Sequence, residues 1–206
     1  MSRLPVQPTK SNLLQLRDDL DFSKTGHQLL SEKREILLMR IKSLINELIA
    51  VQTNLTAALN TGYKKLRKAI LTLGWAKLEM VHIHPEGDVE IEVSEKPYLG
   101  IDLPTFSASK RSNRPSYSPA GSSSTLDEAQ AAFTALIPVV VEYSQRQAQL
   151  VALSIALKKT MKRVNALENV FIPDYVDTVS YVEETLEEIE REEMYVRKLV
   201  KELKEQ

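Results

Sequence analysis

Apolar residues recur along the first third of the chain at alternating steps of three and four. The series has fourteen positions: Leu13, Leu16, Leu20, Ser23, His27, Leu30, Arg34, Leu37, Ile41, Leu44, Leu48, Val51, Leu55 and Ala58. All but Ser23, His27 and Arg34 are apolar, which leaves eleven apolar positions. This spacing is typical of a left-handed coiled coil. A lone helix would leave the stripe in water, so the sequence predicts a long helix over residues 12–78 that packs against another helix.

A second series of the same kind predicts a helix over residues 126–204. Its spacing changes between Val164 and Val179, where fifteen residues cover four turns. A longer period relaxes the left-handed supercoil. Pro173 lies in this stretch, although a proline inside a helix costs about 3 kcal/mol. We therefore predict that the coil changes its twist and bends at this level.

The middle of the chain has a different pattern. The stretches DVEIEV (88–93) and YLGIDL (98–103) alternate with period two around the connection SEKP, which predicts a β-hairpin over residues 88–103. Residues 107–125, rich in Ser, Pro and Arg, predict a flexible surface loop. The predicted fold is mainly α: a single elongated domain, with a long antiparallel two-helix coiled coil and a small β-hairpin inserted between the helices.

The sequence offers no site for covalent chemistry. It has no cysteine and no glycine-rich phosphate loop. His82 and His84, with Glu86 and Asp88 nearby, have the spacing of two metal ligands, but a solvated pair beside a turn is the more common arrangement. The net charge of −1 and the lack of a long apolar run argue against nucleic acid and membrane insertion. We expect no catalytic residue, no cofactor and no bound metal.

The two charged residues of the first series, His27 and Arg34, need partners, because an unpaired charge in a buried seam is costly. Placing residue 80 near residue 130 sets the register of the two helices. That register predicts that Arg34 bonds Asp174 or Asp177. It also places His27 beside Glu183 or Glu184.

Three stretches resemble the D subunit of the V/A-type rotary ATPases: PTKSNLLQLRDDL, GHQLLSEKREIL and above all KKTMKRVNALENVFIPDY (158–175). The likeness runs from about Pro8 to the carboxyl terminus. It implies a non-catalytic central rotor stalk in a complex that makes or hydrolyses ATP and moves protons or sodium ions. The implied partners are the catalytic A/B hexamer, the small F subunit of the rotor and the adaptor of the membrane ring. The implied location is cytoplasmic and peripheral to the membrane.

A basic turn precedes Pro173 and suggests where such a partner would bind. We predict that the hexamer contacts this level of the stalk through charged and polar residues from both helices: Lys33, Arg34, Lys159, Lys162, Arg163, Asn165 and Glu168. The alternative is a prefoldin-like coiled-coil chaperone or scaffold, which also joins two helices through β-hairpins. The chain is about twice as long as such a chaperone needs, and the RVNALE stretch favours the rotor.

Overall fold

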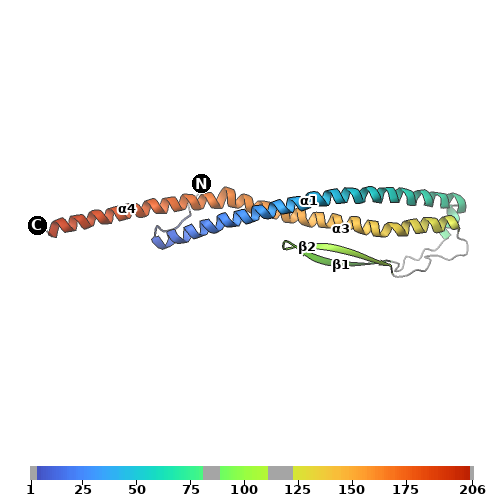
Figure 1. Cartoon of the computed structure of the whole chain (residues 1–206), viewed down its shortest axis with the longest axis horizontal. Coiled ribbons are helices and arrows are strands. Elements are labelled where there is room, and N and C mark those ends of the chain that lie inside the picture. Colours follow the sequence, from blue (N-terminus) through green and yellow to red (C-terminus); the bar gives the residue numbers. More distant parts are fainter. Residues whose placement is uncertain (1–3, 81–88, 111–122, 205–206) are drawn as a thin grey trace. The chain divides into compact units, whose positions relative to one another are not determined.

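The computed structural model describes residues 4–80, 89–110 and 123–204. Its elements follow in the order α1 (Lys10–Leu73), α2 (Trp75–Met80), β1 (Val89–Tyr98), β2 (Ile101–Lys110), α3 (Ser124–Ala166), the π-helix η1 (Leu167–Phe171) and α4 (Ile172–Lys204) (Figure 1). The predicted fold class is confirmed: two long helical segments pair antiparallel, and a two-stranded hairpin lies between them in the sequence.

The chain forms two compact units. The terminal unit comprises Met1–Leu37 and Leu157–Gln206, and the central unit comprises Leu38–Ala156. Antiparallel pairing is visible inside each one. In the terminal unit Lys10 pairs with Glu190 and Arg17 with Glu183.

The packing of the terminal unit follows the predicted seam. Leu16 packs with Val179 and Val182, and partly buried apolar side chains surround them: Leu4, Val6, Leu13, Tyr175 and Leu186. The backbone N–H of Leu4 donates to the Thr178 hydroxyl at 3.1 Å, so the segment before α1 is held against α4. Where α1 and α4 lie side by side, up to Leu186, the seam predicted from spacing alone is therefore the face on which the two helices pack.

In the central unit α1 and α3 pack through large apolar side chains. The rings of Tyr63 and Phe133 meet edge to face with centroids 5.7 Å apart. Gly62 lies beside this pair, and a Cβ there would make an ordinary van der Waals contact with the Phe133 ring at 3.5 Å. Leu44 and Leu153 are completely buried.

The first long helix ends at Leu73, five residues before the predicted boundary at 78. Gly74 has a φ of 78°, in the left-handed region that glycine adopts without steric cost. Its N–H donates to the carbonyl of Ile70 at 2.9 Å, which closes the helix. The short helix α2 then begins at Trp75. Apolar spacing continued through this glycine, so periodicity alone missed the stop.

The hairpin turns at a different place from the one predicted. Tyr98 pairs with Ile101, so the loop consists of Leu99 and Gly100. Both have positive φ, 51° and 73°, as a type I′ turn requires. The SEKP stretch belongs to β1, whose residues are largely exposed and therefore tolerate polar side chains. The prediction of a turn at SEKP was wrong.

The strand β2 runs on to Lys110, so the start of the predicted loop 107–125 is strand. Residues 111–122 lie outside the described part of the chain, as do His82 and His84. The second long helix begins at Ser124, two residues before the predicted 126.

Candidate partner-binding surface

The change of period around Pro173 is produced by a turn of π-helix over Leu167–Phe171. The N–H of Ile172 donates to the carbonyl of Leu167, five residues back, and the backbone on both sides stays in the right-handed helical region. A proline has no N–H to donate and its ring clashes with the carbonyl four residues back. The widened turn relieves this conflict, so the helix continues into α4.

A π-turn inserts one residue into an α-helical ladder, and this explains the fifteen-residue interval seen in the sequence. Two heptads would need fourteen residues. Val164 and Val179, at the two ends of the interval, are both buried. The apolar seam therefore keeps facing α1 across the proline, and the extra residue is absorbed between them.

The predicted partner-binding residues lie just before and within this π-turn. Lys159, Lys162, Arg163 and Asn165 are exposed on α3, and Glu168 lies on η1 with its side chain 60% exposed. Lys33 and Arg34, on α1, are half-buried.

Both groups lie at one level of the terminal unit. His27 of α1 approaches Glu168, with Nε2 and Oε2 3.9 Å apart. One heptad further along α1 is Arg34, and one heptad back from Glu168 is Met161. Arg34 is therefore level with the basic turn of α3.

The basic residues of this level are not bonded to carboxylates of the described part of the chain. None of them takes part in an ion pair there: Lys33, Arg34, Lys158, Lys159, Lys162 and Arg163. Cations grouped in this way repel one another, and a partner that carries carboxylates would relieve the repulsion. We call these six residues the basic collar.

The predicted register of the two helices was wrong. His27 lies beside Glu168, whereas Glu183 accepts from Arg17 through Nε at 3.1 Å and Nη2 at 2.7 Å. A heptad seam packs almost equally well after a slide of one or two heptads, so apolar spacing could not fix the register. The reference point was also misplaced, because Tyr63 already lies against Phe133.

The expected bond from Arg34 to Asp174 or Asp177 is absent: Arg34 forms no ion pair with any described residue. Arg34 is only half-buried, so water solvates the guanidinium and the predicted buried charge does not arise. Its neighbour Arg40, which the sequence placed outside the seam, is the one that bonds a carboxylate, Glu47, at 3.3 Å.

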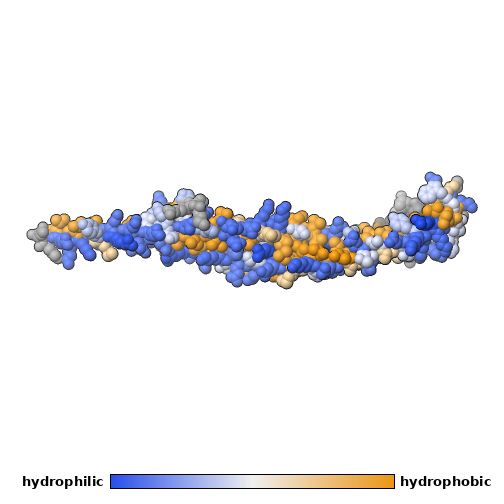
Figure 2. Space-filling view, turned by 90° about the horizontal axis from the view of Figure 1, so that it is seen from above, coloured by the Kyte–Doolittle hydropathy of each residue, from blue (hydrophilic) through white to orange (hydrophobic). Residues whose placement is uncertain are grey.

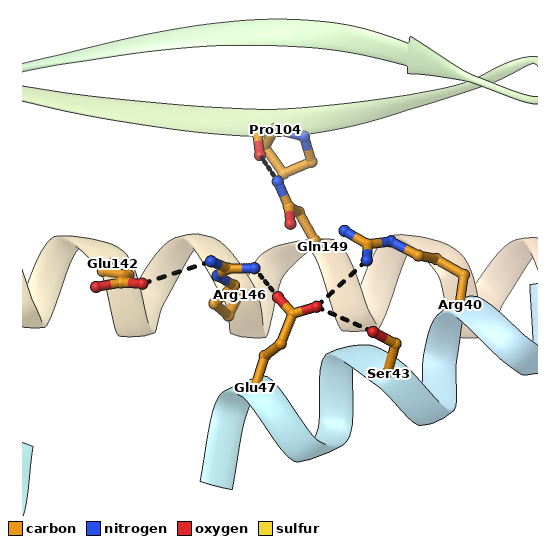
Figure 3. Close-up of polar contacts among 7 residues, drawn as sticks. All are labelled: Arg40, Ser43, Glu47, Pro104, Glu142, Arg146 and Gln149. Atoms are coloured by element: carbon orange, nitrogen blue, oxygen red, sulfur yellow. Dashed lines mark hydrogen bonds and ion pairs between the residues drawn. The ribbon is translucent and has the colours of Figure 1, made fainter. Parts of the chain in front are cut away.

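That carboxylate belongs to a polar cluster in the central unit (Figure 3). Glu47 of α1 accepts from Arg146 of α3, from Arg40 and, at 3.0 Å, from the Ser43 hydroxyl. Arg146 also reaches Glu142 at 3.4 Å. Both Glu47 and Arg146 are about two-thirds buried, so their charges are screened less than those of the exposed pairs in the terminal unit.

The same turns of α3 hold the hairpin. The Gln145 side chain accepts from the N–H of Phe106 at 3.0 Å, and the Gln149 amide donates to the carbonyl of Pro104 at 2.9 Å. Leu103 of β2 is buried beside them. The strand β2 thus lies between α3 and β1, as Figures 1 and 3 both show. Nothing in the sequence pattern of these glutamines had singled them out.

Comparison with known proteins identifies the family to which the chain is similar. The family model for the D subunit of ATP synthase matches residues 12–202. The A-type ATP synthase D subunit of Methanopyrus kandleri is 32% identical over 96% of this chain and 86% of its own length. The V-type ATP synthase D subunit of Thermotoga neapolitana is 31% identical over 97% and 98% of the two chains. The corresponding protein of Clostridioides difficile is 33% identical over 93% and 87%.

The chain belongs to the D-subunit family of ATP synthases. This confirms the resemblance drawn from the stretches around the two long helices. The relatives are D subunits of A-type and V-type ATP synthases. In the described part of this D subunit, no helix is both long and apolar enough to cross a membrane.

The C-terminal end of this D subunit carries a second surface, which the sequence pattern had paired with α1. Because Lys10 begins α1 and pairs with Glu190 at 2.6 Å, the rest of α4 extends beyond the start of α1. Its seam residues Val196, Val200 and Leu203 are 46–72% exposed. Figure 2 shows apolar side chains exposed among charged ones at this end. We call Arg191–Lys204 the α4 overhang.

Proposed function

We propose that this chain is the non-catalytic central rotor of its ATPase. It transmits torque between the catalytic hexamer and the membrane ring that moves ions, and it carries no active site of its own. Membership of the D-subunit family carries this proposal. The long helix, the π-turn and the basic collar suit this role.

Torque transmission needs a shaft that twists little under load. The helix α1 runs without a break for 64 residues, which is about 96 Å at a rise of 1.5 Å per residue. An unbroken backbone ladder leaves no loop in which rotation could be lost. In the central unit, the bond between Glu47 and Arg146 joins α1 to α3 and opposes sliding of one helix past the other.

A rotor must also be asymmetric, because it has to hold chemically identical catalytic interfaces in different states. A uniform coiled coil presents much the same surface in every direction. The π-turn at Leu167–Phe171, followed by Pro173, breaks that uniformity at one level. We propose that it bends the shaft there and that the bend acts on one interface at a time.

The basic collar lies at the same level and supplies the contacts in this proposal. Lys159, Lys162 and Arg163, with Lys33 and Arg34 from α1, bond carboxylates on the hexamer, and Asn165 and Glu168 add polar contacts. Charge-assisted bonds of this kind are short and directional. They are also weakened by salt where they remain exposed.

The α4 overhang and the central unit account for the remaining partners. We propose that the exposed apolar seam of the overhang is covered by the hexamer, because an apolar stripe continued past its own partner helix indicates another partner. The central unit meets the small F subunit of the rotor and the adaptor of the membrane ring. The chain then works on the cytoplasmic side, attached to the membrane only through these partners.

The test is reconstitution of the purified chain with the catalytic hexamer, followed by measurement of rotation under ATP hydrolysis. A rotor turns inside the hexamer with a bead attached to its central unit. A hexamer that hydrolyses ATP while the bead stays still contradicts the proposal. Binding of unfolded clients in place of the other ATPase components supports the prefoldin-like alternative.

A further inference from the structure

The two edges of the hairpin differ in how their backbone groups are used. On the edge formed by β2, Phe106 donates its N–H to Gln145 and Pro104 accepts from Gln149. These groups therefore point away from β1, toward α3. That edge is closed by helix side chains and cannot pair with another strand.

The alternation of an antiparallel ladder fixes the direction of the groups on β1. Two residues directly opposite each other either both turn their backbone N–H and C=O groups toward the other strand or both turn them away from it. Phe106 faces Val93 and Pro104 faces Glu95, so Val93 and Glu95 also point their N–H and C=O outward. By the same alternation Ile91 does so too. Within the described part of the chain, nothing bonds these outward groups.

From Glu90 to Val93 the side chains along this open edge alternate between acidic and apolar, and beyond them Glu95 falls on the apolar face and Lys96 on the acidic face. Ile91 and Val93 lie on one face of the hairpin and are 57% and 62% exposed. Glu90 and Glu92 lie on the other face, because side chains alternate along a strand. A third strand laid beside β1 would place one set of its side chains next to the two apolar residues and the other set next to the two glutamates.

A second copy of this chain is a poor occupant of the edge. Two antiparallel β1 strands that set Ile91 beside Val93 would also set Glu92 beside Glu92, and like charges on neighbouring strands are destabilising. The register that sets Glu90 beside Lys96 instead places the apolar Ile91 beside Glu95. Basic residues of an incoming strand, placed beside Glu90 and Glu92, would instead stabilise its pairing with β1. The charge of the edge therefore selects a basic strand.

We propose that the open edge of β1 binds an extended segment of another protein, which joins the hairpin as a third strand. The segment alternates apolar residues, which lie against Ile91 and Val93, with lysines or arginines, which lie beside Glu90 and Glu92. Its backbone bonds the outward groups of Ile91, Val93 and Glu95. The proposal concerns the hairpin alone and holds whether or not the chain acts as a rotor.

The experiment uses the full chain and a short synthetic peptide of alternating valine and lysine. Binding is followed by fluorescence anisotropy and by amide hydrogen exchange of Ile91, Val93 and Glu95. We expect saturable binding and slower exchange at Val93 and Glu95. The same peptide with N-methylated valines has the same charge but lacks half of its donors, and it should bind at least about tenfold more weakly.

Two variants separate strand pairing from attraction by charge. Val93→Pro removes an outward N–H without breaking the bond pattern to β2, and we expect at least about a tenfold loss of affinity. Glu92→Lys should reduce affinity several-fold, and less so at high salt. The matched control Glu188→Lys makes the same charge change on exposed α4 and should leave affinity within about twofold.

Several results would overturn the proposal. One is the absence of saturable binding; another is equal binding of the N-methylated peptide or of the Val93→Pro chain. A larger loss in Glu188→Lys than in Glu92→Lys would show that the peptide adsorbs to α4 through charge. Exchange protection of β1 that grows with protein concentration in the absence of peptide would identify a second copy as the occupant.

Discussion

The terminal and central units both contain an antiparallel helix pair, but the charged side chains that join the two helices differ in burial. In the terminal unit the charged pairs lie at the rim: the Arg17 and Glu183 side chains are 55% and 38% exposed. In the central unit the Arg146 and Glu47 side chains are 27% and 32% exposed, and three donors converge on one carboxylate. Within the described residues, the π-turn and the unpaired basic collar belong to the terminal unit.

The two units therefore differ in how firmly their own polar contacts fix the two helices. A half-buried carboxylate with several donors fixes the position of its helix, because any slide would leave it unsatisfied. Exposed pairs contribute little and can be exchanged for pairs with a partner. The central unit is thus defined by its own contacts, whereas the basic collar of the terminal unit has charges that its own fold leaves uncompensated.

The largest effect is expected from removing the irregularity of the terminal unit. Deleting Asn169 alone restores a heptad count but forces Pro173 into regular helix, and we expect a loss of about 3 kcal/mol in the free energy of unfolding. Deleting Asn169 together with Pro173→Ala should restore stability, because the seam stays in phase. Chemical denaturation measures both. If the single deletion is as stable as the unaltered chain, the π-turn does not exist to accommodate the proline.

The second prediction addresses the basic collar. Lys162→Glu with Arg163→Glu should weaken assembly with the catalytic hexamer about tenfold or more at low salt, because two attractions become repulsions. The affinity of the unaltered chain should itself fall as salt rises. Surface plasmon resonance at several salt concentrations measures both trends.

A matched control for this charge reversal lies in the central unit. Lys64→Glu with Arg67→Glu makes the same change in another basic cluster and should leave the affinity for the hexamer unchanged. Equal losses in the two double variants would mean that net charge, and no specific collar contact, governs assembly.

The third prediction compares the two kinds of ion pair directly. Arg146→Met should cost about 1–3 kcal/mol in the free energy of unfolding, because it leaves the half-buried Glu47 with fewer donors. Arg17→Met, at an exposed pair, should cost less than about 1 kcal/mol. Urea denaturation of the two variants gives the comparison. The reverse order would show that the rim pairs, and not the polar cluster, fix the helices.

The smallest effect concerns Lys10 and Glu190, which are exposed to solvent. The hydrogen bond between them raises the pKa of Lys10 and lowers the pKa of Glu190. A carboxyl whose pKa is lowered by folding stabilises the fold above its unfolded pKa and loses that contribution as the pH falls through the folded value. The ordinary pKa of a glutamate is 4.5, so the loss belongs below that pH.

Comparison with Glu190→Gln isolates this pair from the other carboxylates. The variant should be slightly less stable than the unaltered chain at neutral pH, and the difference should vanish in acid. Thermal unfolding followed by circular dichroism from neutral pH to about pH 3 measures it. A difference that persists unchanged in acid would assign the effect to packing.

The helices and their antiparallel pairing could be predicted because the spacing of apolar residues can be read from the chain itself. Apolar residues every three and four positions require a buried stripe, so the helices, their pairing and even the fifteen-residue interval around Pro173 followed from spacing. The family likewise followed from the RVNALE stretch and its neighbours. The hairpin followed from alternation, although its turn did not, because a leucine with positive φ at residue 99 is rare in any sequence statistic.

The register of the helices was decided only by tertiary structure. A seam of leucines and valines looks alike after a slide of one heptad, so spacing determines which face is buried but not which residue it meets. Three polar contacts mark the register that the fold adopts: His27 near Glu168, Arg17 with Glu183 and Glu47 with Arg146. Of these, the partly buried pair of Glu47 and Arg146 contributes most to the choice, because exposed pairs contribute little.

The contacts of Gln145 and Gln149 with β2 were likewise decided only by tertiary structure. Glutamine is common on solvated helices. Its side chain binds a strand, as Gln145 and Gln149 do here, only when the backbone groups of that strand lie within hydrogen-bond distance. The sequence by itself thus determined which face of each helix is apolar, but not how far along α4 that face is covered by α1. The partners of individual polar groups depended on distances that exist only in the folded chain.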